Sequence, residues 1–272
     1  MKKSLARLVA ATALAALSSA AWAGISNTKH NLTSTGPGPH NTSSTDQICV
    51  FCHTPHGADT SASVPLWNKD LPTNTYQTYA DLNTSSLDGE ILPVGSVSLA
   101  CLSCHDGTQA MDNIINAPGS GGYDVTGGGA GGLAFTWTSG ADTLTGSPIP
   151  NLGTDLRNDH PIGIEYCGGG LSGTSTTVSG TCDDLDFKTT EVQTKEVNTR
   201  QVFWVDTSVG TAGVREKTDI ALYTRTFAGG DGPSVECASC HDPHVETKGT
   251  DNVHFMRVTL AGSEICLSCH VK

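Results

Sequence analysis

The chain has 272 residues, of which 37% are hydrophobic and only 6% aromatic, and its formal net charge at pH 7 is −12. A surface of this sign repels nucleic acids and anionic lipids, so nucleic-acid binding is excluded and basic partners or cations are favoured. With 31 glycines and few apolar side chains, the chain is not expected to build a large conventional core.

Residues 1–23 have the pattern of a secretory signal peptide. A basic start is followed by an apolar, alanine-rich run over 8–21 and by a small-x-small cleavage site at Ala21-Trp22-Ala23. The apolar run is too short for a spanning helix, with a retained membrane anchor as the alternative. We expect an exported mature chain that begins near Gly24, has no membrane span and carries 12 basic and 27 acidic residues, a net charge of −15.

Four Cys-x-x-Cys pairs are each followed directly by histidine. They comprise Cys49, Cys52 and His53; Cys101, Cys104 and His105; Cys237, Cys240 and His241; and Cys266, Cys269 and His270. A Cys-x-x-Cys pair alone would also fit half a zinc site or a redox dithiol. Histidine after all four pairs is roughly a one-in-a-million coincidence, and it is the attachment signature of c-type haem. The sequence therefore predicts four haem c groups, with the cysteines as covalent attachment points and the histidines as proximal iron ligands.

The motifs divide the chain after the signal peptide into three regions. Residues 24–110 contain a polar N-terminal arm and haems 1 and 2, and residues 233–272 contain haems 3 and 4. Residues 111–232 form a glycine-rich insert with a β-prone stretch at 197–205 that predicts a short strand or hairpin. We expect a mostly irregular chain with short helices and few short strands, organised around a stacked chain of haems.

Two cysteines remain after the eight that the haem motifs use. Cys167 and Cys182 lie in the insert, outside any Cys-x-x-Cys context. In an oxidising compartment such a pair is predicted to form a disulfide, with free thiols or an intermolecular bond as alternatives. Closing a loop of this length stabilises the fold by about 3 kcal/mol.

The sixth iron position distinguishes an electron carrier from an enzyme. Six histidines lie outside the motifs, which is enough for a distal ligand on every haem: His30, His40, His56, His160, His244 and His254. Bis-histidine ligation closes both faces of each haem, favours low reduction potentials and leaves no open site for a substrate. We therefore expect an electron carrier without catalytic residues, and a reductase with one open haem is the alternative.

Local sequence separates these six candidates. His56 and His244 occur in the repeated phrase Cys-His-x-Pro-His, where each lies too close to its own haem to reach the opposite face and is expected to serve a neighbouring iron. His160 is the only histidine of the insert and is expected to be a ligand. His30, His40 and His254 compete for the remaining position.

Several phrases resemble the doubled-CXXCH multihaem cytochromes, including 28–32, 49–57, 159–163, 237–244 and 266–270. The tetrahaem count and order are similar to those of the extracellular filament cytochromes, or nanowires, of metal-reducing bacteria. The resemblance covers both ends and a short central phrase, but not 111–155 or 164–232. It implies stacked bis-histidine haems, with distal ligands His30, His160 and His244 from the same chain and His56 donated to an adjacent subunit. His40 and His254 have no counterpart.

The expected function is long-range electron transfer, by a subunit of a head-to-tail extracellular filament. The expected partners are copies of the chain, redox proteins and external electron acceptors. A monomeric periplasmic shuttle is the alternative, because carriers of that kind share several of the phrases.

Overall fold

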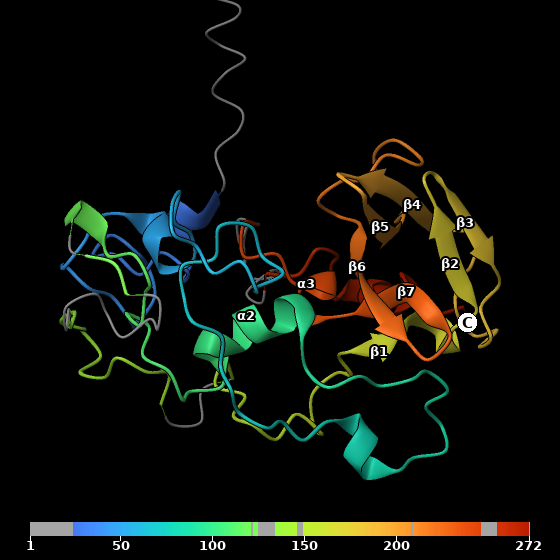
Figure 1. Cartoon of the computed structure of the whole chain (residues 1–272), viewed down its shortest axis with the longest axis horizontal. Coiled ribbons are helices and arrows are strands. Elements are labelled where there is room, and N and C mark those ends of the chain that lie inside the picture. Colours follow the sequence, from blue (N-terminus) through green and yellow to red (C-terminus); the bar gives the residue numbers. More distant parts are fainter. Residues whose placement is uncertain are drawn as a thin grey trace, which may run out of the picture.

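The computed structural model describes residues 24–120, 122–124, 134–145, 149–207, 209–245 and 255–271. The predicted signal peptide and His254 lie outside these ranges. Figure 1 shows a loop-rich part formed by the first half of the described chain, a β-rich part formed by the second half, and helices α2 and α3 between them.

The loop-rich part contains short helices: η2 (Gly24–Asn27), η3 (Ile48–Phe51), η4 (Tyr79–Leu82), α2 (Ser96–His105) and η5 (Pro118–Ser120). A small core lies beside the first two motifs and contains Val50, Phe51, Met111, Ile114, Ala117, Phe135, Trp137 and Leu144. The fully buried Lys69 connects the loops around this core, because its Nζ donates to the Ala110 carbonyl across 2.8 Å. A buried ammonium satisfied by carbonyl oxygens holds these irregular segments in place.

Seven strands form two antiparallel sheets in the described part of the second half. The larger sheet has the order β1-β7-β6-β5-β4, and the smaller sheet pairs β2 with β3. The strands are β1 (Ile164–Glu165), β2 (Leu171–Thr174), β3 (Thr177–Gly180), β4 (Val192–Val197), β5 (Arg200–Val205), β6 (Ile220–Phe227) and β7 (Gly230–Val235).

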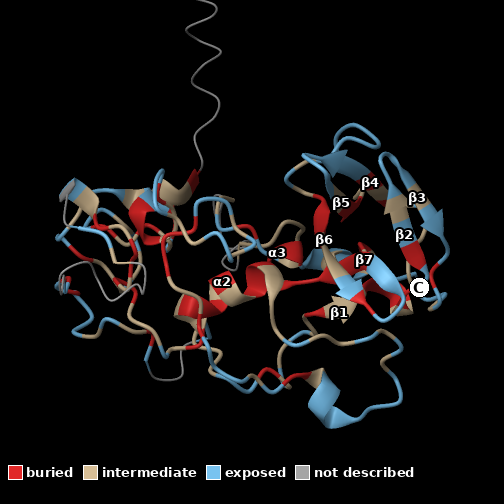
Figure 2. Ribbon diagram, in the orientation of Figure 1, coloured by how far each residue is buried: buried red, intermediate tan, exposed pale blue. Residues whose placement is uncertain are grey.

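The β-rich part has its own hydrophobic core. Alternate residues of β5 and β6, including Phe203, Val205, Ile220 and Leu222, are almost completely buried in it (Figure 2). The predicted disulfide between Cys167 and Cys182 is present, with the two Cα atoms 5.3 Å apart, and both cysteines lie within this core.

The prediction of a mostly irregular chain organised around haems was wrong, since the structure is a two-sheet antiparallel β architecture joined to a loop-rich part. Composition averaged over the whole chain concealed how apolar residues gather between 164 and 235, where they bury one another. The stretch at 197–205 contains β5, but its partners extend the sheet well beyond an isolated hairpin.

The C-terminal segment packs against the β-rich part. It contains α3 (Cys237–Cys240), η8 (Ala261–Ser263) and α4 (Glu264–Leu267). Ile265 and Cys269 contact the β core, and the backbone nitrogen of Lys188 donates to the Cys269 carbonyl across 2.7 Å. None of the described helices is long and apolar enough to cross a membrane.

Candidate functional site

Each Cys-x-x-Cys-His motif includes a helical turn. In the first, third and fourth motifs the backbone nitrogen of the histidine donates to the backbone carbonyl of the first cysteine. The distances are 2.8 Å at His53, 3.1 Å at His241 and 2.9 Å at His270. The second motif occupies the last residues of α2. Because residues three apart share one side of a helical turn, the two cysteines of a motif lie on the same side, and the backbone bond holds the histidine next to them.

Two motif histidines have one ring nitrogen held by a backbone carbonyl. His53 Nδ1 lies 2.8 Å from the Pro65 oxygen, and His105 Nδ1 lies 2.7 Å from the Pro150 oxygen. A carbonyl in this position fixes the tautomer with hydrogen on Nδ1 and leaves the Nε2 lone pair for a metal. Both imidazoles are therefore oriented as proximal ligands require.

A second histidine faces each of these two rings. The ring centroids of His53 and His244 are 6.1 Å apart, and those of His30 and His105 are 6.0 Å apart. Two imidazoles on opposite sides of one iron, with metal–nitrogen bonds of about 2.0 Å, would have centroids about 6 Å apart. The residues present therefore fit bis-histidine haem at the first and second motifs.

The surroundings of His30 suit a neutral metal ligand, and the ring of His244 is held by a carboxylate. Burial, followed by the charges of His105, His244 and His241, lowers the pKa of His30 to about 4, and its Nδ1 is buried with no hydrogen-bond partner among the described residues. His244 Nδ1 lies 3.1 Å from Asp242 Oδ1. The carboxylate orients the His244 ring through Nδ1, and Nε2 takes no part in this contact.

The attachment cysteines of consecutive motifs are neighbours. Burial raises the pKa of the Cys52 thiol to about 12, and the adjacent Cys104 of the second motif adds to the shift. Burial also raises the pKa of Cys269 to about 12, and Cys240 of the third motif contributes in the same direction. The first motif therefore adjoins the second, and the third adjoins the fourth.

The second and third motifs are in direct contact. A hydrogen bond with the Cys237 thiol, followed by burial, raises the pKa of the Cys101 thiol. The backbone nitrogen of Cys237 donates to Ser98 Oγ across 3.0 Å, and Ser98 Oγ donates to Glu236 Oε2 across 2.5 Å. All four attachment points thus follow one another in space in their order along the chain.

Glu236 is the centre of this contact. Its side chain is completely buried and forms a 3.1 Å ion pair with Arg225. Burial raises the pKa of Glu236, against the hydrogen bonds from Ser98, Arg225 and Ser234. Sequence reasoning missed Ser98, Arg225 and Glu236, because polar residues near a motif resemble any surface residue until their partners, up to 138 residues away, are known.

Neither a protein-family model nor a curated protein matches this chain.

The other predicted ligands lie apart from these two pairs. His56 and His160 are exposed, and His160 Nδ1 lies 3.0 Å from the Pro161 carbonyl. His40 Nδ1 lies 3.0 Å from Ser139 Oγ. The ring of His270 packs against Phe187 at 4.1 Å, and no ring contact within the described ranges places a second histidine beside it.

Within the described ranges, no group of three or more histidine, cysteine, aspartate or glutamate side chains is arranged to hold a metal ion. The first two motifs differ from such a cluster, since each brings two imidazoles together beside a pair of thiols. Two imidazoles suffice for an iron whose other four ligands come from a porphyrin, and the thiols would attach that porphyrin to the chain.

Proposed function

We propose that the protein is a tetrahaem c-type cytochrome that transfers electrons along bis-histidine haems. One observation carries this proposal. The ring of His244 lies opposite that of His53, and the ring of His30 lies opposite that of His105, with ring centroids 6.1 and 6.0 Å apart beside a Cys-x-x-Cys pair. Haem supplies the one-electron iron couple, and the chain supplies attachment, axial ligands and a low-dielectric surrounding.

The order of the motifs supports a continuous path. Cys52 and Cys104 pack against the same small core, the Cys101 and Cys237 thiols are hydrogen-bonded, and the charge of Cys240 acts on Cys269. These relationships support a sequence of attachment points from the first motif to the fourth. Since each haem is tied to two cysteines and a histidine of its motif, neighbouring motifs in contact hold neighbouring haems close together. A short separation at every step is what a molecular conduit requires.

We also propose that the mature protein is exported and forms head-to-tail filaments, in which His56 donates an iron ligand to an adjacent subunit. The exposed side chain of His56 and the anchoring of its backbone carbonyl by Thr54 Oγ1 (2.9 Å) and Asn116 Nδ2 (3.0 Å) support this role. A heterologous contact between the two ends of a haem chain extends without closing. Such a filament would carry electrons to external acceptors, whereas a monomer would act as a periplasmic shuttle.

The test is production of the full chain, with its signal peptide, in a bacterial host that attaches haem c. We expect four covalent haems per chain by mass and by the pyridine haemochrome assay, and a wholly low-spin ferric spectrum that cyanide and nitrite leave unchanged. Fewer than four haems would contradict the cofactor assignment. A stoichiometric high-spin signal that responds to nitrite would favour the reductase alternative over the carrier.

A further inference from the structure

The ring of His270, the histidine of the fourth motif, packs against Phe187 of the β-rich part. The two ring centroids are 4.1 Å apart, and the ring planes are tilted by 48°. Carbon atoms in contact are about 3.5–4.0 Å apart, and an imidazole that pointed its edge at the phenyl centre would bring atoms closer than that. The phenyl ring therefore lies over a face of the imidazole, and the ring edge that bears both nitrogens stays open to an iron.

Backbone pairing determines that these two residues meet. The segments around them form an antiparallel bridge in which Phe187 is opposite His270. The backbone nitrogens of Lys188 and Val271, one on each side of this pair, donate to carbonyls of the opposite segment, each across 2.7 Å. Residues bracketed by such bonds have the most closely spaced side chains of an antiparallel pair. The contact between the rings therefore follows from the register of the two segments.

A buried tyrosine packs against Phe187. The rings of Tyr166 and Phe187 meet edge to face, with centroids 5.3 Å apart and planes at 78°. Tyr166 is 1% exposed, and its hydroxyl donates to the Lys188 carbonyl across 3.0 Å. The adjacent Cys167 is joined to Cys182 by the disulfide. Phe187 is thus supported by the cross-linked core of the β-rich part.

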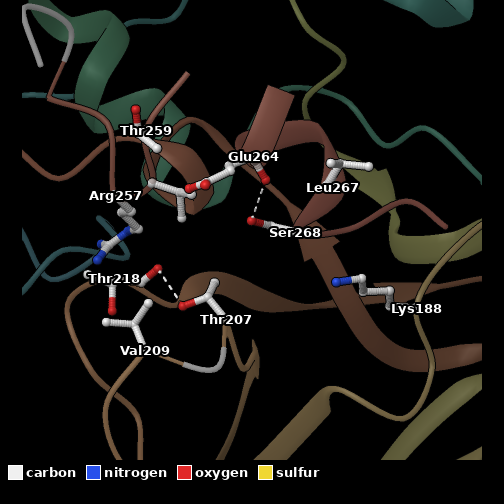
Figure 3. Close-up of a pocket in the computed structure, with 10 residues that line it drawn as sticks. Lys188, Thr207, Val209, Thr218, Arg257, Thr259, Glu264, Leu267 and Ser268 are labelled. Carbon is white, nitrogen blue, oxygen red and sulfur yellow. Dashed lines mark hydrogen bonds between the residues drawn. The ribbon is translucent and has the colours of Figure 1, made fainter. Parts of the chain in front are cut away.

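The helical turn that leads to His270 is fixed as well. Within this turn, Ser268 Oγ donates to the Glu264 carbonyl across 2.9 Å. Lys188, next to Phe187 in the chain, lines the same cavity as Ser268 (Figure 3). The segment that carries the phenyl ring and the turn that carries the motif histidine consequently lie side by side.

Two other motif histidines are held in a different way. A backbone carbonyl lies 2.8 Å from Nδ1 of His53 and 2.7 Å from Nδ1 of His105. Within the described ranges, no hydrogen bond reaches a ring nitrogen of His270, which is an exposed residue. Since partners outside the metal–ligand bond orient a ligating imidazole, the phenyl ring takes at His270 the place that a carbonyl has at the other two.

We propose that Phe187 positions the proximal histidine of the fourth haem. A phenyl ring against the imidazole face prevents rotation of His270 about its bond to iron, and so fixes the plane of this ligand relative to the porphyrin. Phe187 acts through His270 and is a positioning residue. The β-rich part thereby controls the ligand geometry of one redox centre. This inference rests on the proposed haem attachment at Cys266 and Cys269.

The test uses the haem-loaded full chain and electron paramagnetic resonance, because the resonance positions of a low-spin ferric haem depend on the planes of its axial imidazoles. Phe187→Leu keeps an apolar side chain but removes the flat ring. We expect one of the four low-spin signals to shift or broaden, while the covalent haem count stays at four. Phe187→Tyr retains the ring and should reproduce the wild-type spectrum. Phe203→Leu, the matched control, removes a ring of β5 from the same core and should leave all four signals unchanged.

Phe187→Met provides the same test with a more adaptable side chain, should the leucine variant fail to fold. Four unmoved signals in a folded Phe187→Leu or Phe187→Met protein would overturn the proposal. An equal shift in Phe203→Leu would also overturn it, because the change would then come from general loosening of the core. A wild type with fewer than four haems would refute the carrier function, whereas four haems with unmoved signals in the variants would refute only the role of Phe187.

Discussion

Ser98 Oγ donates to Glu236 Oε2 across 2.5 Å, and this bond connects two residues that are 138 positions apart. Ser98 lies one helical turn before Cys101, and Glu236 directly precedes Cys237. The bond therefore couples the helix of the second motif to the turn of the third. Arg225 pairs with Glu236 from the β-rich part, so the same carboxylate also joins the sheet to both motifs.

Glu236→Ala should lower the free energy of unfolding by about 3 kcal/mol, because it leaves the largely buried Arg225 guanidinium without its partner. Ser98→Ala should cost about 1–3 kcal/mol through the loss of a buried hydrogen bond. Denaturant titration followed by circular dichroism measures both changes. Glu196→Gln, on the exposed part of β4, is the matched control and should remain within about 0.5 kcal/mol of the wild type. A Glu236→Ala protein as stable as this control would show that the buried pair has no net effect.

His244→Ala and His30→Ala should each convert one haem to the high-spin state without loss of covalent haem, because each variant lacks the imidazole that faces a motif histidine. Electron paramagnetic resonance of the ferric protein counts the high-spin irons. His40→Ala is the control, since its ring contacts Ser139, and it should leave the spectrum unchanged. A low-spin spectrum in both ligand variants would contradict the pairing.

His160→Ala should likewise create one high-spin haem while all four haems stay attached. The Pro161 carbonyl beside Nδ1 leaves Nε2 available for an iron, although the ring is exposed in the described chain. The same resonance measurement applies. If the spectrum of this variant equals that of the wild type, the distal ligand position assigned to His160 belongs to another histidine.

Replacing both Cys167 and Cys182 by Ser should lower the free energy of unfolding by about 3 kcal/mol, the contribution expected for a closed loop of this length. The haem absorption should not change, because both cysteines lie in the core of the β-rich part rather than in a motif. Denaturant titrations monitored at the haem band and by circular dichroism test the two statements together. Two alkylatable thiols in the unreduced wild-type protein would contradict the bond itself.

His56→Ala should give folded, haem-loaded monomers that do not polymerise, because the exposed imidazole proposed to reach the next subunit is missing. Electron microscopy and sedimentation of the purified protein provide the measurement. His40→Ala should still form filaments. Normal polymerisation of the His56 variant, or a wild type that stays monomeric at every concentration, would favour the periplasmic shuttle.

Sequence reasoning reached the features that local chemistry determines. The remaining Cys167 and Cys182 could be paired by elimination, and the structure contains their disulfide. The haem attachment that the spacing of Cys49, Cys52 and His53 indicates stays a prediction. It failed for the sheets, because the burial of Phe203 and Leu222 depends on strand register across the sheet and not on overall composition. It also failed for Ser98 and Glu236, whose roles come from contact between distant segments.

Along the chain, β1 is the first strand of the larger sheet and β7 is the last. These two strands are hydrogen-bonded neighbours, with Ile164 opposite Val235. The chain therefore enters and leaves the β-rich part at nearly the same place, as an inserted domain does in a host protein. The loops between these two residues can lengthen, shorten or acquire new surface while Cys101 and Cys237 keep their contact, as long as Arg225 still reaches Glu236. Natural variation in such a protein would consequently accumulate in the loops between the strands, and the spacing of the second and third Cys-x-x-Cys-His motifs would stay constant.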